Sequence, residues 1–138
     1  MALRINATVV TKFLTALMLL ACMHLAIATG ATRLPGTYSS LKYNVEGGDL
    51  VGFEVRVVPT NLGTKAVVQV AEGDAGRIYI VDVAEKSGIV SFEIPLAAGL
   101  RAGFKGKVTS KGLDGTITYP SGEHKVLFLP RCTSYWER

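Results

Sequence analysis

Residues 89–118 read IVSFEIPLAAGLRAGFKGKVTSKGLDGTIT, and this stretch decides the fold class. Val90, Phe92 and Ile94 alternate with polar residues, and Phe104 is followed by an alternation of lysines with apolar or small residues. Alternation with period two is typical of a strand that has one face against a core and the other in water. The connections are shorter than the dozen residues that a parallel pair of strands needs. The stretch therefore predicts sequential antiparallel strands.

A local repeat inside this stretch predicts a hairpin. The sequence FKGKVT at 104–109 is echoed nine residues later by LDGTIT at 113–118. Each copy has a large apolar residue, then a glycine on the same face, then a β-branched residue. A glycine inside a strand usually marks a bend, a bulge or the close approach of another group. Gly106 and Gly115 therefore either curve the sheet, as glycines do in barrels, or leave interior room for a ligand.

The same pattern of short apolar runs separated by turn residues extends from Gly36 to Pro130. Turn signals such as EGG at 46–48 and PTNLG at 59–63 separate short runs rich in Val, Ile, Phe, Tyr and Thr. Several short strands at this spacing are typical of a sandwich or a barrel. We expect eight strands, at residues 37–43, 50–58, 65–72, 77–84, 89–94, 103–109, 113–119 and 124–130. The predicted fold class is all-β, an antiparallel up-and-down meander that closes into a small barrel because closure removes exposed edges, with a flattened β-sandwich as the alternative.

The N-terminal segment differs in composition and predicts an export signal. Residues 13–28, FLTALMLLACMHLAIA, carry no charge, Arg4 and Lys12 precede them, and no acidic residue lies among them. A basic start followed by an apolar run and small residues is typical of a signal peptide. We expect a signal peptide over residues 1–28 and a single domain over residues 29–138 that is exported, either periplasmic or secreted.

The sequence leaves three fates open for this segment. A small-x-small site at 26–28 favours cleavage before Thr29. The sequence LLAC at 19–22 is similar to a bacterial lipobox and predicts instead a lipoprotein anchored through a lipidated Cys22. The third fate is an uncleaved anchor, although the sixteen residues of 13–28 fall short of the roughly 20 that a spanning helix needs. Membrane contact is expected only in the last two cases.

Composition and charge argue against several functional classes. The chain has 138 residues with 15 Lys+Arg and 11 Asp+Glu, and without Arg4 and Lys12 the net charge is +2. This balance, an export signal and the lack of a basic aromatic motif argue against nucleic-acid binding. A chain of this length also excludes a multidomain enzyme. Lys105 and Lys107 share the outer face of one expected strand, where they are either simply solvated or form an electropositive patch.

No sequence motif predicts catalysis, a metal or another cofactor. Residues 29–138 contain one histidine, His124, and Ser121 lies three residues before it. A catalytic triad needs a serine held by the histidine and a third residue that orients the ring. Glu72 and Asp74 share one turn but lack the oxygen-rich spacing of a calcium loop. We therefore expect a protein that is not an enzyme and that has no metal site and no cofactor.

Residues at both ends of the expected barrel resemble a known family. Gly36-Thr37-Tyr38 opens the first strand just after a proline, and Arg131 follows the last strand. The arrangement resembles the lipocalin-like (calycin) barrels, in which a Gly-x-Trp opens strand one and an arginine from the end of the barrel packs across that Trp. Tyr38 stands here where the family has Trp. The resemblance covers residues 35–136 and implies a small exported barrel, but a fold alone does not establish a function.

The first functional hypothesis is a non-enzymatic binding module that holds a small apolar ligand. An eight-stranded barrel encloses just enough space for its own side chains or for one small ligand. The predicted ligand-contacting residues are aromatic and lie on the apolar phases of the strands or at one end of the barrel: Tyr38, Phe53, Phe92, Phe104, Phe128 and Trp136. These side chains either line a pocket or fill the interior completely.

The alternative is a protein-interaction module, such as a hydrolase inhibitor or an immunity-type protein that binds an extracytoplasmic protein. Function often resides on loops that a rigid scaffold holds, and the loops at 59–64 and 95–103 are the candidates. Leu96 and Leu100 either contact a partner or fold back onto the interior. The run at 77–84 is apolar on both faces apart from its charged residues, so it is either covered on both sides or faces a partner.

Overall fold

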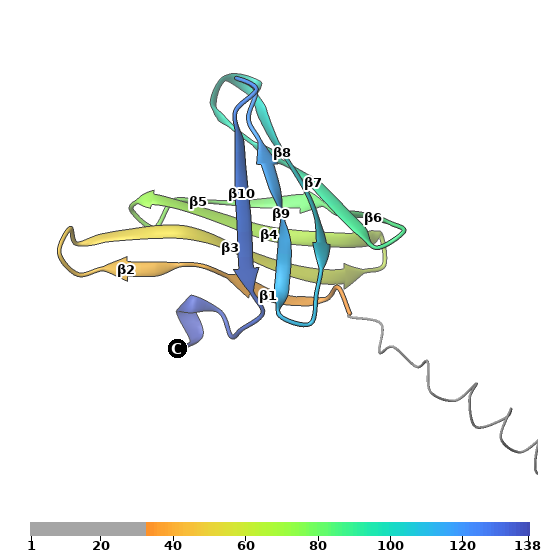
Figure 1. Ribbon diagram of the computed structural model, residues 1–138, viewed down its shortest axis with the longest axis horizontal. Coiled ribbons are helices and arrows are strands. Elements are labelled where there is room, and N and C mark those ends of the chain that lie inside the picture. The colour runs from red at the N-terminus through yellow and green to blue at the C-terminus, as the bar shows by residue number, and fades with distance from the viewer. Residues whose placement is uncertain (1–32) are drawn as a thin grey trace, which may run out of the picture. The chain divides into compact units, whose positions relative to one another are not determined.

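Two antiparallel five-stranded sheets make up residues 33–138, the part of the chain that the computed structural model describes. The strands are β1 (Gly36–Ser39), β2 (Lys42–Asn44), β3 (Asp49–Thr60), β4 (Gly63–Gly73), β5 (Arg77–Asp82), β6 (Ala84–Lys86), β7 (Ile89–Pro95), β8 (Arg101–Val108), β9 (Gly112–Thr118) and β10 (His124–Pro130). Sheet A has the order β1-β3-β4-β5, with β2 also paired to β3, and sheet B has the order β10-β9-β8-β7-β6. In Figure 1 the strands of sheet A lie across the view, and strands β7 to β10 of sheet B run steeply across them.

All eight expected strands are found, and two of them are divided in the structure. The first expected strand becomes β1 and β2, which keep one continuous register against β3. Between them the Ser40 N–H donates to the Phe53 carbonyl at 2.8 Å, and the Ser40 hydroxyl accepts the Phe53 N–H at 3.2 Å. Gly52 lies beside this break with φ +117°, and a Cβ there would collide with the Ser40 backbone. Only glycine allows the two strands to approach so closely.

The second division, at Val83, turns the chain from sheet A into sheet B. The Val83 N–H donates to the Thr64 carbonyl at 2.9 Å, and from Ala84 onward the chain pairs with β7. On the opposite side a single isolated bridge between Tyr38 and Arg131 joins β1 to the end of β10. No closed barrel is found among the described residues, and the two sheets are consistent with the flattened sandwich that the sequence left open.

The core lies between the two sheets and is filled at its centre. The alternation in β3 places Phe53, Val55 and Val57 in the core, each at most 5% exposed. In sheet B, Phe92 and Phe104 are directly paired across β7 and β8, and their rings stack with centroids 4.7 Å apart. Aromatic pairs of this kind contribute about 0.5–1.5 kcal/mol beyond the area that they bury.

The two repeat glycines face each other and make room for a side chain of the protein itself. Gly106 pairs with Gly115 across β8 and β9. A Cβ built on either glycine would lie only 2.7 or 2.6 Å from Cζ of Phe104. The space above the glycines is therefore occupied by the Phe104 ring, and it is not available to a ligand.

We expect Gly115→Ala to lower the free energy of unfolding by about 1–3 kcal/mol, because the added methyl group overpacks the core against Phe104 and the Gly106 backbone. The measurement is urea unfolding followed by circular dichroism. Gly103→Ala is the matched control: it lies in the same sheet, and its Cβ would meet no atom within 4 Å. Equal stability of the two variants would contradict this account of the glycine pair.

Candidate functional site

A cavity of about 370 Å³ opens between the sheets at one end of the sandwich. It lies where the β4–β5 hairpin meets the chain segments that follow β7 and β9. Its floor is apolar and comes from both sheets: Phe53, Val70, Ile94, Leu96, Ala102 and Ile117. Ligand pockets in proteins have about this size and this mainly apolar lining. We refer to it as the end cavity.

Polar groups stand at the rim of the end cavity. Glu72, Asp74 and Arg77 come from the β4–β5 hairpin, and the rings of Tyr79 and Tyr119 come from opposite sheets. None of the ion pairs found among the described residues involves these three charged side chains. The lining therefore combines charges of both signs and two tyrosine rings with the apolar residues of the floor.

The hairpin that carries the rim charges has a defined shape. The Asp74 carboxylate accepts the Gly76 N–H at 2.7 Å, which closes the turn. Gly76 has φ +63°, and a Cβ there would collide with the Val70 carbonyl. The side-chain amide of Gln69 donates a hydrogen bond to the Ala75 backbone carbonyl. These contacts hold the turn against its own strand and keep its charged side chains at the mouth of the cavity.

The phenol of Tyr119 stays protonated at the rim. Burial raises the pKa of Tyr119, and the nearby carboxylates of Glu72 and Glu123 raise it further. Both effects disfavour the phenolate, because its negative charge would be poorly solvated and would face two carboxylates. The Tyr119 side chain is therefore neutral.

The structure does not gather the six predicted aromatic residues in one cavity, although Phe92 stacks on Phe104, and Phe53 and Phe128 line one surface hollow. Phe53 lies on the floor of the end cavity. Tyr38, Phe92 and Phe104 are buried in the core and do not line this cavity. Phe128 and Trp136 lie outside the core altogether. The predicted role of all six residues in contacting a ligand stays a prediction. Phe128 and Trp136, however, do not lie in the interior where the sequence placed them, since both are exposed.

Phe128 faces outward because the sequence around it is apolar on both faces. Its side chain is 46% exposed, while its neighbours Leu127 and Leu129 are 7% and 0% exposed. Leu129 pairs with Leu113, which is fully buried, and Leu127 pairs with Gly115 on the inner face. In a run of consecutive apolar residues, period two does not select the inner face, so the register with β9 decides it.

Trp136 lies on the outer face of sheet A and closes no end of the sandwich. It belongs to a 3-10 turn, Tyr135–Glu137, and is 57% exposed. Its indole N–H donates to the Gln69 side-chain oxygen at 2.7 Å. Gln69 points away from the core because it alternates with the inward-facing Val68 and Val70 on β4.

Tyr38 and Arg131 join the first strand of sheet A to the end of sheet B. The Arg131 guanidinium stacks over the Tyr38 ring at 4.8 Å from its centroid, and Nη2 donates to the Tyr38 hydroxyl at 2.6 Å. The Tyr38 hydroxyl donates in turn to the Leu34 carbonyl at 2.6 Å, and Arg131 also donates to the Pro35 carbonyl at 3.0 Å. Burial raises the pKa of Tyr38, and the Arg131 charge offsets part of that rise. The pair fixes the chain that leads into β1.

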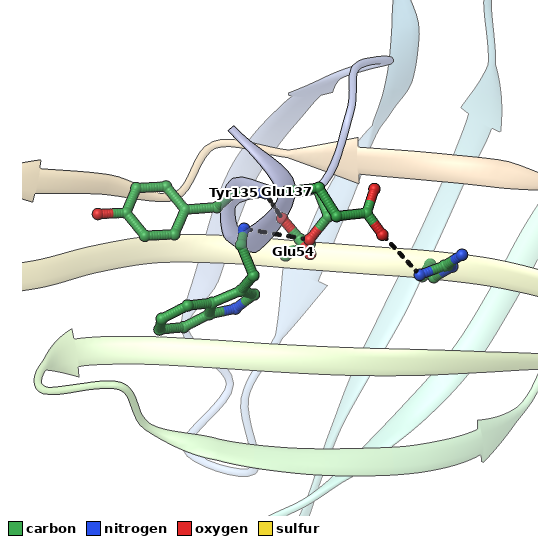
Figure 2. Close-up of polar contacts among 6 residues, drawn as sticks. Glu54, Tyr135 and Glu137 are labelled. Carbon is green, nitrogen blue, oxygen red and sulfur yellow. Dashed lines mark hydrogen bonds and ion pairs between the residues drawn. The ribbon is translucent and has the colours of Figure 1, made fainter.

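The last residues of the chain dock on sheet A through one buried carboxylate, which sequence reasoning missed. Glu54 is 7% exposed although it points to the outer face of β3. Its carboxylate accepts the Ser134 hydroxyl at 2.5 Å and the Tyr135 N–H at 2.8 Å. Figure 2 shows Tyr135 and Glu137 pointing in opposite directions from the turn, and Glu137 pairs with Arg56 at 3.3 Å.

Beneath this C-terminal segment lies a second, smaller apolar cluster. Leu41, Leu50 and Ala71 are buried on the outer face of sheet A, and Tyr135 packs against them. Alternation in β3 predicts only that Glu54 lies opposite the core-facing residues. No local pattern in the sequence indicates that the C-terminal residues cover it, because the two segments are about eighty positions apart.

The loop between β7 and β8 divides its two leucines. Leu96 packs against the core and lines the end cavity, whereas Leu100 is 52% exposed. The Leu96 N–H donates to the Leu100 carbonyl at 2.8 Å and closes the loop. Leu96 thus folds back onto the interior, which is one of the two arrangements expected for these leucines. Leu100 remains at the surface.

The polar side chains considered for catalysis make other contacts. The His124 Nδ1 lies 3.0 Å from the Thr118 hydroxyl, and the Ser121 hydroxyl accepts the Glu123 N–H at 3.3 Å. Within residues 33–138 no three His, Cys, Asp or Glu side chains gather in a way that suits a metal ion. In the same part of the chain no helix has the length and hydropathy that crossing a membrane requires.

The predictions for residues 1–28, including lipidation at Cys22, lie outside the described residues. Comparisons of the chain with protein-family models, with curated proteins and with solved structures give no match. The end cavity and the docked C-terminal segment therefore rest on the residues and their geometry alone.

Proposed function

We propose that this chain is an exported binding module and that the end cavity holds a small molecule with an apolar body and a polar group at one end. The cavity of about 370 Å³ between the sheets is the observation that carries the proposal. Its size falls at the lower end of the range of about 300–1,000 Å³ for small-molecule sites. The ligand is therefore small and occupies one end of the sandwich.

The lining supports a ligand of this chemistry. The floor offers apolar contact from both sheets, and burial of apolar area contributes about 25 cal/mol per Å² to binding before the entropic terms are subtracted. The rim offers the neutral Tyr119 hydroxyl and side chains of both charges. An apolar body against the floor and a polar group at the rim would satisfy both halves of the site.

The N-terminal sequence pattern also supports this proposal. The pattern favours export or, through Cys22, anchoring as a lipoprotein, and this is the location that we propose for the binding module. The centre of the molecule is filled, so the site proposed here is the open end of the sandwich.

The test is fluorescence titration with N-phenyl-1-naphthylamine, an uncharged apolar dye that becomes bright in apolar sites. We expect saturable binding by the unmodified protein, and a loss of at least about tenfold in affinity for Ala102→Leu, because a 2% exposed floor residue then fills the cavity. Ala84→Leu is the matched control, since this exposed alanine lies outside the end cavity.

Two outcomes would contradict the proposal. One is no saturable binding of the dye by the unmodified protein, and the other is equal affinity of the two leucine variants. If Ala102→Leu does not fold, as judged by circular dichroism, Leu96→Trp replaces it, because this partly buried loop residue lies at the cavity and its enlargement blocks the space from the loop side.

A further inference from the structure

The charges that line the end cavity are unequal in number. The lining contains the carboxylates of Glu72 and Asp74, and the Arg77 guanidinium is the only positive group among the described residues that line it. Two negative charges against one positive leave the lining with a net charge of −1. None of the ion pairs among the described residues includes these three side chains, so the arginine neutralises neither carboxylate by direct contact.

The two carboxylates differ in what they already bind. Asp74 accepts the Gly76 N–H at 2.7 Å and is engaged in closing the hairpin turn. Glu72 makes no side-chain hydrogen bond and no ion pair with the described residues. It follows Val70 by two positions on β4, so both side chains lie on the inner face of the strand. Glu72 is therefore the carboxylate that is free to meet a ligand beside the apolar floor.

Tyr119 shows that the charge is also negative on the side of the cavity that sheet B forms. Burial raises the pKa of Tyr119, and the charges that raise it further are the carboxylates of Glu72 and Glu123. Glu123 lies close because its backbone carbonyl accepts the Tyr119 N–H at 2.9 Å. A ligand group placed near this phenol thus lies in a negative field, and such a field favours a cation.

The remaining surroundings do not reverse this balance. The Lys125 ammonium lies 5.3 Å from the centroid of the Phe53 ring, but Lys125 lines a separate surface hollow and not the end cavity. Glu123 also lies outside the lining and carries the opposite charge, so the two offset each other. Three of the lining residues are aromatic, namely Phe53, Tyr79 and Tyr119. Aromatic rings attract cations over their faces, which adds to the preference for positive charge.

We propose that the polar group of the ligand is a positively charged amine, so that the end cavity selects an apolar ammonium compound. This inference rests on the proposed function, because it names the chemistry of the ligand for the same site. The apolar body packs on the floor, and the ammonium group lies at the rim beside Glu72. A carboxylate in that position would face Glu72 and Asp74 with Arg77 as its one partner of opposite charge in the lining. A neutral alcohol would gain no attraction between charges.

The test is displacement of bound N-phenyl-1-naphthylamine at neutral pH by three probes of the same chain length: n-octylammonium, 1-octanol and octanoate. We expect n-octylammonium to displace the dye at a concentration at least about fivefold lower than 1-octanol, and octanoate to require the highest concentration. If the three probes displace the dye equally, or if octanoate is the most effective, the inference is wrong while the proposed function stands. Failure of the unmodified protein to bind the dye contradicts the proposed function itself.

Substitutions at the rim test whether these charges set the preference. Glu72→Gln removes one negative charge at nearly constant size, and it should lower the preference for n-octylammonium over 1-octanol at least about threefold. Arg77→Gln should raise the preference, because it removes the positive charge from the lining. Both residues are exposed, so both variants should fold.

Asp114→Asn is the matched control for the loss of a negative charge. Asp114 is exposed on β9, pairs with Lys107 and lies outside the end cavity, so its substitution should leave the preference unchanged. An unchanged preference in Glu72→Gln, or an equal fall in Asp114→Asn, would show that the charge at the cavity does not select the ligand.

Discussion

Phe104→Ala is expected to lower the free energy of unfolding by about 3–5 kcal/mol, the largest effect of any substitution considered. Phe104 is 2% exposed, stacks on Phe92 with ring centroids 4.7 Å apart, and fills the space above Gly106 and Gly115. Removing the ring leaves a void above Gly106 and Gly115. Neither glycine has a side chain that could move into this void, so it stays largely unfilled. Urea unfolding gives the free energy directly.

Phe128→Ala provides the matched control for this prediction, because it removes the same ring from the same sheet. Phe128 is 46% exposed, so its loss should lower the free energy of unfolding by no more than about 1 kcal/mol. If the two variants lost equal stability, the assignment of inner and outer faces in sheet B would be wrong. If Phe104→Ala does not fold, Phe104→Leu, which leaves a smaller void, replaces it and should give the same ranking.

Glu54→Ala is expected to release the C-terminal segment and to lower the free energy of unfolding by about 2–4 kcal/mol. The substitution removes the acceptor of the Ser134 hydroxyl and of the Tyr135 N–H, at 2.5 and 2.8 Å. Hydrogen bonds to a charged group are among the stronger ones in proteins, and here both partners lie where water has little access. Tyr135 should then leave the small apolar cluster that it covers.

Limited trypsin digestion reports the release of the segment separately from global stability. Cleavage after Arg131 removes the last seven residues, and mass spectrometry detects the shortened chain. We expect faster cleavage there in Glu54→Ala than in the unmodified protein. Glu93→Ala is the control, because its carboxylate pairs with Arg101 at the surface, where both side chains are 63% exposed. Such pairs contribute at most about 1 kcal/mol, so cleavage should not change. An unchanged rate in Glu54→Ala would mean that Glu54 does not hold the segment.

The strands could be predicted closely from local patterns. The run at 103–109 is found as β8, and that at 113–119 is found as β9, each within two residues at either end. Their alternation and their turn residues are properties of a few neighbouring positions, so the sequence alone determines them. The two divided strands could not be predicted in the same way. Whether residues 77–84 stay in one sheet depends on where β7 lies, and that is a contact between distant parts of the chain.

The candidate site was only partly predictable, for a related reason. Of the six aromatic residues that the sequence suggested, Phe53 alone lines the end cavity. Tyr79 and Tyr119 stand at its rim, but they come from opposite sheets and share no sequence pattern. Phe128 shows the limit most clearly, because five consecutive apolar residues, Val126 to Pro130, leave both faces of β10 equally apolar.

The amino-acid sequence by itself determined that this protein is all-β, that its strands are antiparallel neighbours, and that its strongest alternations face a core. These properties follow from side-chain periodicity and turn chemistry, which act over a few residues. Tertiary structure alone decided that two sheets form, that the C-terminal segment docks on Glu54, and that one end stays open as a cavity. Each of these depends on which surfaces meet after the strands have paired, and burial of one surface against another is a property of the whole fold.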